Sequence, residues 1–92
     1  MRILVTLTFV RAVKKLHKQQ KVALDEAVRA IANQPDVGDA KVGDLAGVQV
    51  YTFRMGTLLC LLAYRVLDEN TLKLLMVGPH ENFYRDLKRT DH

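Results

Sequence analysis

The residues best suited to do chemistry lie near the end of the sequence, after an apolar run over residues 72–77 that stops at a Gly-Pro pair. They are His80, Tyr84 and Arg85. If a helix begins after the Gly-Pro pair, His80 and Tyr84 stand four residues apart and share one of its faces. An imidazole, a phenol and a guanidinium at the edge of a sheet would suit a phosphate-bearing substrate.

The length and composition predict one folded domain over residues 1–92. The chain is 49% hydrophobic and 26% charged, which is typical of a globular domain rather than a disordered one. The longest apolar run, residues 58–64, is far shorter than the roughly 20 residues that a membrane-spanning helix needs. The single cysteine, Cys60, cannot form an internal disulfide, and the first residues lack a signal-peptide cleavage site. We therefore expect a cytoplasmic protein that does not associate with membranes.

Basic residues outnumber acidic ones, which gives a net charge of +4 and a pI near 9.5. This balance is compatible with nucleic acid or with an acidic protein partner. The cations gather in two clusters, over residues 11–21 and residues 85–89. Because exposed lysines are common, the first cluster is expected to be the solvated face of a helix.

Hydrophobic periodicity predicts a strand and then two helices in the first part of the chain. Residues 2–7 alternate as a strand, and from Phe9 the apolar positions recur at helical spacing, with Thr8 as the expected N-cap. The polar stretch 18–21 interrupts this pattern and is expected to be a turn. The apolar face of the second helix is formed by Leu24, Ala27, Val28 and Ile31. Residues 33–38, which include a proline and a glycine, end that helix.

The second half of the chain predicts a meander of strands after a loop at residues 36–47. The strands are expected over residues 47–55, 58–67 and 71–77, and the tight turns between them favour antiparallel pairing. A short helix follows. The order β-α-α-β-β-β-α predicts an α+β domain, in which a helical hairpin packs on one face of the sheet and leaves the other face open.

The first meander strand alternates cleanly between two faces. One face carries Gln49, Tyr51, Phe53 and Met55, and the other carries Val48, Val50, Thr52 and Arg54. We expect the helical hairpin to cover one of these faces. Function is expected on the open face.

Four segments together resemble one known family. They are GDLAG at residues 43–47, YTFR at 51–54, LAYRVLD at 62–68 and GPHENFYRDL at 78–87. In this order and at this spacing, across nearly the whole chain, the sequence resembles the RelE/ParE superfamily, the toxin half of bacterial toxin–antitoxin pairs. RelE-like members cleave mRNA in the ribosomal A site, whereas ParE-like members poison DNA gyrase.

The resemblance implies a small bacterial cytoplasmic toxin that a cognate antitoxin neutralises and that meets operator DNA only through that antitoxin. On the RelE-like branch, which we favour, the toxin acts on the ribosome and mRNA as a metal-independent endoribonuclease without a cofactor. On the ParE-like alternative it inhibits gyrase by protein binding, with no nuclease chemistry. A third interpretation is a relative that keeps the fold and antitoxin binding but has lost toxicity.

RelE-like cleavage uses the RNA 2′-hydroxyl as nucleophile on its own phosphate, so it needs a base, cations for the developing charge and an acid. The resemblance places Arg54 at the second of two basic positions on the first meander strand. It also places His80 at the basic residue after the glycine, and Tyr84 at or near the tyrosine that stacks on a substrate base. Arg65 and Arg85 are candidate substrate-binding residues, with a plain surface charge as the alternative for each. Arg65 points to the same face as Arg54 if the strand registers hold.

Two positions depart from the RelE pattern. Thr52 and Leu61 stand where many relatives carry a lysine and an arginine, so the open face becomes partly apolar. The exposed side chains of Leu59 and Leu61 would then suit an antitoxin segment that covers them. Because a guanidinium is not a base at neutral pH, Arg54 can only stabilise charge, and His80 must carry the proton transfer.

Overall fold

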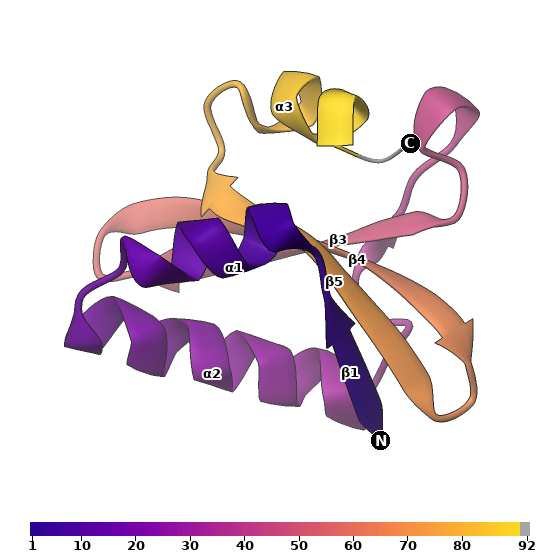
Figure 1. Ribbon diagram of the computed structural model, residues 1–92, viewed down its shortest axis with the longest axis horizontal. Helices are drawn as coiled ribbons and strands as arrows, with labels where there is room; N and C mark the ends of the chain where they lie inside the picture. Colours follow the sequence, from indigo (N-terminus) through magenta and orange to yellow (C-terminus); the bar gives the residue numbers. More distant parts are fainter. Residues whose placement is uncertain (91–92) are drawn as a thin grey trace.

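The computed structural model describes residues 1–90 and confirms the predicted α+β fold (Figure 1). Its elements, in chain order, are β1 (Arg2–Val5), α1 (Leu7–Lys14), α2 (Lys18–Asn33), β2 (Asp39–Ala40), a 3-10 turn η1 (Gly43–Leu45), β3 (Val48–Met55), β4 (Leu58–Asp68), β5 (Thr71–Pro79) and α3 (Phe83–Thr90). The predicted loop before the meander thus contains two short elements, β2 and η1.

All strands belong to one sheet, in the order β1-β5-β4-β3-β2. The predicted meander of β3, β4 and β5 is antiparallel, with Val48 opposite Arg65 and Met55 opposite Leu58 in the first hairpin. The first strand, β1, pairs in parallel with β5, the last, so the two ends of the fold meet in the sheet. This long-range pairing has no signature in the local sequence pattern.

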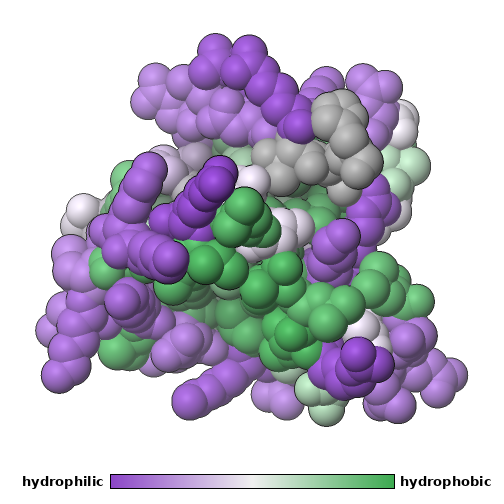
Figure 2. Space-filling view, viewed as in Figure 1, coloured by the Kyte–Doolittle hydropathy of each residue, from purple (hydrophilic) through white to green (hydrophobic). Residues whose placement is uncertain are grey.

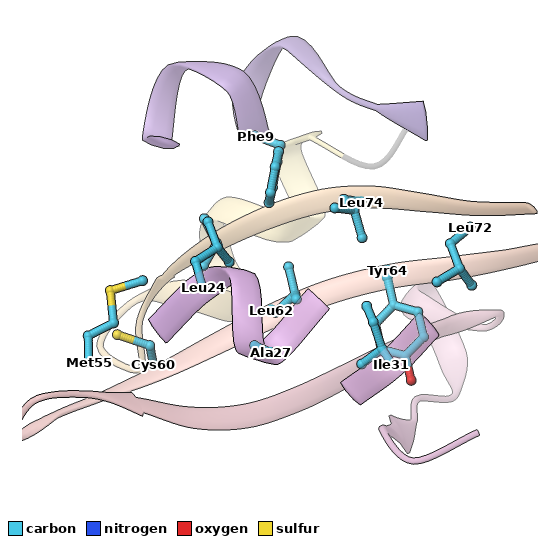
Figure 3. Packing of buried hydrophobic residues seen from close by; sticks show 11 residues of the cluster. Phe9, Leu24, Ala27, Ile31, Met55, Cys60, Leu62, Tyr64, Leu72 and Leu74 are labelled. Carbon is cyan, nitrogen blue, oxygen red and sulfur yellow. The ribbon is translucent and has the colours of Figure 1, made fainter. Parts of the chain in front are cut away.

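The helical hairpin of α1 and α2 covers one face of the sheet, which we call the hairpin face (Figure 1). In Figure 3, Phe9 of α1 and Leu24, Ala27 and Ile31 of α2 lie against strand residues of this core. The buried strand side chains here are Met55, Cys60, Leu62, Tyr64, Leu72, Leu74 and Val77. The predicted division of β3 is confirmed, because Tyr51 and Phe53 also pack against this cluster.

The opposite face is only partly open, which corrects the prediction: Thr52 and Arg54 are exposed, but α3 covers the apolar residues of this face. We call it the α3 face, and its buried residues are Leu45, Val48, Val50, Leu61, Ala63, Leu75, Met76, Phe83 and Leu87. Phe83 and Leu87, four residues apart on α3, are 1% and 0% exposed. Leu61 is only 2% exposed and Leu59 is half-buried, so these leucines are not a free docking surface. An apolar sheet face needs a cover, and the two apolar side chains of α3 supply it.

Two helix boundaries also differ from the prediction. The N-cap of α1 is Thr6, not Thr8: its Oγ1 accepts a hydrogen bond from the Phe9 N–H at 3.0 Å and donates one to the Leu75 carbonyl at 2.6 Å. The break between the helices falls at residues 15–17, and α2 begins at Lys18 instead of after a turn there. The Gln20 side chain accepts a hydrogen bond from the His17 N–H at 3.0 Å, which satisfies the start of α2.

The largest group of exposed apolar side chains lies at β1 and the start of α1. Ile3, Leu4, Val5 and Leu7 are 41%, 40%, 47% and 63% exposed. Figure 2 shows an apolar patch in this region, whereas the surface around α3 is hydrophilic. A contiguous exposed apolar patch of this kind is typical of a surface that meets another protein.

Candidate functional site

His80 and Tyr84 are neighbours in the structure, but not because they share a helical face. The sequence predicted a helix that contains both His80 and Tyr84, but α3 begins only at Phe83. His80 lies in the turn before it. Asn82 adopts a left-handed backbone, with φ at 61°, which redirects the chain from β5 into α3. The rings of His80 and Tyr84 meet edge-on, with centroids 6.5 Å apart and an interplanar angle of 87°.

The backbone of His80 is held from both sides. Its N–H donates to the Leu59 carbonyl at 3.2 Å, and its own carbonyl accepts from the Phe83 N–H at 3.3 Å. His80 is an exposed residue, so a substrate can reach its imidazole. The site therefore offers a fixed main chain with an accessible side chain, which suits a group that must transfer a proton to a bound substrate.

Tyr84 is half-buried between three side chains. Its ring lies edge-on to Phe83 at 5.7 Å and to His80, and the Lys41 Nζ lies 5.1 Å from its centroid. Phe83 takes the core position and leaves the Tyr84 ring partly accessible. A half-exposed aromatic ring of this kind can stack on a nucleic-acid base.

Arg54 lies at the same end of the sheet as His80. It pairs in register with Leu59, the residue whose carbonyl binds the His80 N–H, so the backbones of Arg54 and His80 are two strands, or about 10 Å, apart. The Arg54 side chain shares the α3 face with Val48 and Val50, is exposed, and donates to the Thr57 carbonyl at 3.3 Å. The structure therefore brings the backbones of His80 and Arg54 to one end of the sheet, with the Tyr84 ring beside His80.

Arg65 and Arg85 do not join this group in the same way. Arg65 lies on the same face as Arg54, but six residues along β4 from Leu59, which is about 20 Å. Its Nη1 donates to the Ala46 carbonyl at 3.1 Å. Arg85 follows Tyr84 on the surface of α3, where its Nε lies 3.7 Å from the Asp86 carboxylate.

The sequence analysis missed Lys41 as a neighbour of Tyr84 and gave Lys88 only as part of the basic cluster at residues 85–89. Lys41 reaches the ring from the loop after β2, and Lys88 reaches the same hollow from the last turns of α3. The hollow has a volume of about 270 Å³ and is lined by Lys41, Val42, Asp44, Leu45, Tyr84 and Lys88. No periodicity links residue 41 to residue 84, so only the tertiary structure reveals this neighbourhood.

The side chains of this site are an imidazole, a phenol and a guanidinium. Within residues 1–90, no three His, Cys, Asp or Glu residues are grouped as a metal site would require. In the same part of the chain, no helix has the length and apolar character to cross a membrane. The arrangement can supply an imidazole for proton transfer, a guanidinium for charge and an aromatic ring for stacking.

Comparisons with known proteins agree with this architecture. A family model described as the ParE-like toxin of type II bacterial toxin–antitoxin systems matches residues 3–88. A search of curated proteins found no match.

Among solved structures, a double arginine-to-alanine mutant of the E. coli toxin RelE in the free state is 14% identical. It covers 97% of this chain and 90% of its own, with a TM-score of 0.73. The E. coli RelBE toxin–antitoxin complex is 17% identical over 87% of this chain and 96% of that one, with a TM-score of 0.71. An archaeal RelE–RelB complex from Pyrococcus horikoshii is 18% identical over 87% and 94%, with a TM-score of 0.54. At these identities the likeness shows the fold.

Proposed function

We propose that this chain, which belongs to the ParE-like toxins of type II bacterial toxin–antitoxin systems, is an endoribonuclease that cleaves mRNA on the ribosome. The observation that carries this proposal is the edge-on pair of His80 and Tyr84, with the backbone of Arg54 about 10 Å from that of His80. An imidazole, an aromatic ring and a guanidinium supply proton transfer, base stacking and charge stabilisation.

In the proposed reaction no metal takes part. The RNA 2′-hydroxyl loses its proton as its oxygen attacks the adjacent phosphorus, and the bond to the 5′-oxygen breaks as that oxygen takes up a proton, which leaves a 2′,3′-cyclic phosphate and a 5′-hydroxyl. His80 accepts the proton of the 2′-hydroxyl and passes it to the 5′-oxygen, because a guanidinium does not act as a base and Arg54 can only stabilise the charge that develops on the phosphate oxygens. Tyr84 stacks on a base beside the scissile phosphate. Arg85 is placed to contact the same strand, and Arg65, about 20 Å along β4, a more distant part of it.

We also propose that a cognate antitoxin neutralises this toxin in the bacterial cytoplasm and brings it to operator DNA. Two of the structural relatives are toxin–antitoxin complexes. The exposed apolar residues of β1 and the start of α1, from Ile3 to Leu7, give such a partner a surface to cover. This surface replaces Leu59 and Leu61 as the expected contact.

Gyrase inhibition is the second candidate function, and two observations favour it. The α3 face has no cation at Thr52 or Leu61, and Leu61 is buried beneath α3. The family description also names ParE. A toxin of this kind would bind its target protein through its surface and would not need His80 for any proton transfer.

Inducible expression with primer extension on a translated reporter mRNA separates these candidates. We expect the wild type to cut within codons and the His80→Ala/Tyr84→Ala variant to leave the mRNA intact. His17→Asn is the matched control, since it removes an exposed imidazole on the hairpin face and keeps a good N-cap for α2. Growth arrest by the wild type with intact mRNA would reject the ribonuclease and direct the work to gyrase supercoiling.

A further inference from the structure

The hollow between η1 and α3 combines an aromatic ring with two cations that come from different parts of the chain. Tyr84 forms one wall, and the apolar side chains of Val42 and Leu45 line the rest together with Lys41, Asp44 and Lys88. The Lys41 N–H donates to the Val48 carbonyl at 2.9 Å, which fixes the start of this loop against β3. The hollow is thus attached to the sheet, and the long lysine side chains reach into it.

Both cations are held only weakly. The Lys41 ammonium lies over the Tyr84 ring at 5.1 Å, and the Lys88 Nζ lies 3.9 Å from the Asp44 Oδ2. The side chains of Lys88 and Asp44 are 55% and 85% exposed, so water screens this ion pair and it contributes little. Two ammonium groups against one carboxylate leave the hollow with a net positive charge.

A nucleotide matches this combination of groups. A planar base stacks on an aromatic ring, and a stacked base is held more strongly than an exposed cation over the same ring. The flexible Lys41 stem lets its ammonium leave the ring and turn to a phosphate, while Lys88 exchanges the Asp44 carboxylate for the same anion. The proposed function already places a substrate base on Tyr84; we infer that Lys41 and Lys88 are further substrate-binding residues, which hold the phosphate of that nucleotide in this hollow.

This inference rests on the proposed function and explains how the toxin compensates for its missing cations. The α3 face lacks positive charge at Thr52 and Leu61, and α3 covers part of that face. Lys41 and Lys88 supply positive charge from the loop and the helix instead. Tyr84 neighbours both His80 and Lys41, so a nucleotide in the hollow would lie close to His80.

The test measures binding of a fluorescent single-stranded RNA octamer to the His80→Ala protein, by anisotropy at several salt concentrations. We expect Lys41→Ala and Lys88→Ala to weaken binding by about threefold to tenfold each, and to lower the slope of log affinity against log salt by about 0.7 each. Asp44→Asn is expected to strengthen binding, because it removes the carboxylate that competes with the phosphate. Tyr84→Ala is expected to weaken binding, whereas Tyr84→Phe keeps it.

Lys18→Ala is the matched control, because Lys18 is an exposed lysine at the start of α2. Lysine variants of the hollow that bind like Lys18→Ala would overturn the inference, as would weaker binding by Asp44→Asn. Binding that survives Tyr84→Ala would overturn the stacked base. Cleavage is scored separately in the primer-extension assay. RNA binding that depends on Lys41 and Lys88, without any mRNA cleavage, would reject the ribonuclease but keep this binding site. Cleavage that is unchanged by substitution of both lysines would keep the ribonuclease but reject this binding site.

Discussion

The two faces of the sheet are built differently. The hairpin face is covered by α1 and α2, which together bring Phe9, Leu24, Ala27 and Ile31 into one buried cluster. The α3 face is covered by a helix of eight residues that contributes Phe83 and Leu87. Helices this short are marginal by themselves, so α3 depends on these two contacts. We infer that the hairpin face stabilises the fold, whereas the α3 face carries the candidate catalytic residues next to the short helix that covers it.

A buried tyrosine connects the stable face to the candidate site. The Tyr64 hydroxyl donates to the Pro35 carbonyl at 2.6 Å and accepts from the Gly38 N–H at 3.0 Å. These bonds fix the segment that leads into β2 and then to Lys41. The hairpin face therefore positions a residue of the opposite face through the loop that joins them.

The largest expected difference between the two faces is a loss of catalytic activity without a loss of stability. We expect His80→Ala to reduce mRNA cleavage by about 10²- to 10⁴-fold, because it removes the group that transfers a proton. The free energy of unfolding should stay nearly unchanged, since the His80 side chain is exposed and its backbone hydrogen bonds remain. Single-turnover cleavage on programmed ribosomes and urea denaturation measure the two quantities. Equal loss of stability and cleavage would make His80 a structural residue.

The next effect compares two leucines that are both fully buried. Leu62 lies on the hairpin face and Leu87 on α3, and both are 0% exposed. Leu62→Ala should lower the free energy of unfolding by about 4 kcal/mol, and Leu87→Ala by about 2 kcal/mol, because the short α3 can relax around the lost volume. Hydrogen exchange of the α3 amides should speed up only in Leu87→Ala. Equal losses of unfolding free energy in both variants would contradict the inference that the hairpin face stabilises the fold more than α3 does.

A smaller effect tests the connection through Tyr64. Tyr64→Phe removes the hydroxyl and leaves the Pro35 carbonyl and the Gly38 N–H without it, which should cost about 1–2 kcal/mol of unfolding free energy. Tyr51→Phe is the matched control, because Tyr51 is a half-buried tyrosine on the same face. Urea denaturation measures the cost. A Tyr64→Phe protein as stable as the control would show that the loop holds its place without this anchor.

The smallest effect is a dependence of stability on alkaline pH that arises on the hairpin face. Burial raises the pKa of the Cys60 thiol and of the Tyr64 phenol above their usual values near 9.0 and 10.0. The folded state therefore keeps protons that the unfolded state releases, so the stabilisation is complete below pH 9.0 and is lost as the pH rises through the raised values. Urea denaturation at pH 7.5 and at about pH 10.5 should show this loss. It should be smaller in a Cys60→Ala/Tyr64→Phe protein than in the wild type, and an equal loss in both would assign it to other groups.

Several features of the fold followed from the sequence because they depend on local patterns. The alternation from Val48 to Met55 determined which side chains of β3 share a face, since successive residues of a strand point in opposite directions. The tight turns after Met55 and Asp68 determined the antiparallel meander. The helical spacing from Leu24 to Ile31 determined the buried face of α2.

Other features were decided only by the tertiary structure, because they join segments that no local pattern relates. The parallel pairing of β1 with β5, the burial of Leu61 beneath α3 and the contact of Lys41 with Tyr84 depend on long-range packing. The sequence predicted that His80 and Tyr84 are neighbours because they share one helix. In the structure they are neighbours because a turn with Asn82 at positive φ lies between them. Arg65 shared the correct face, yet the strand register placed it at the far end from His80. Periodicity determines which face a side chain occupies, and packing determines what it meets there.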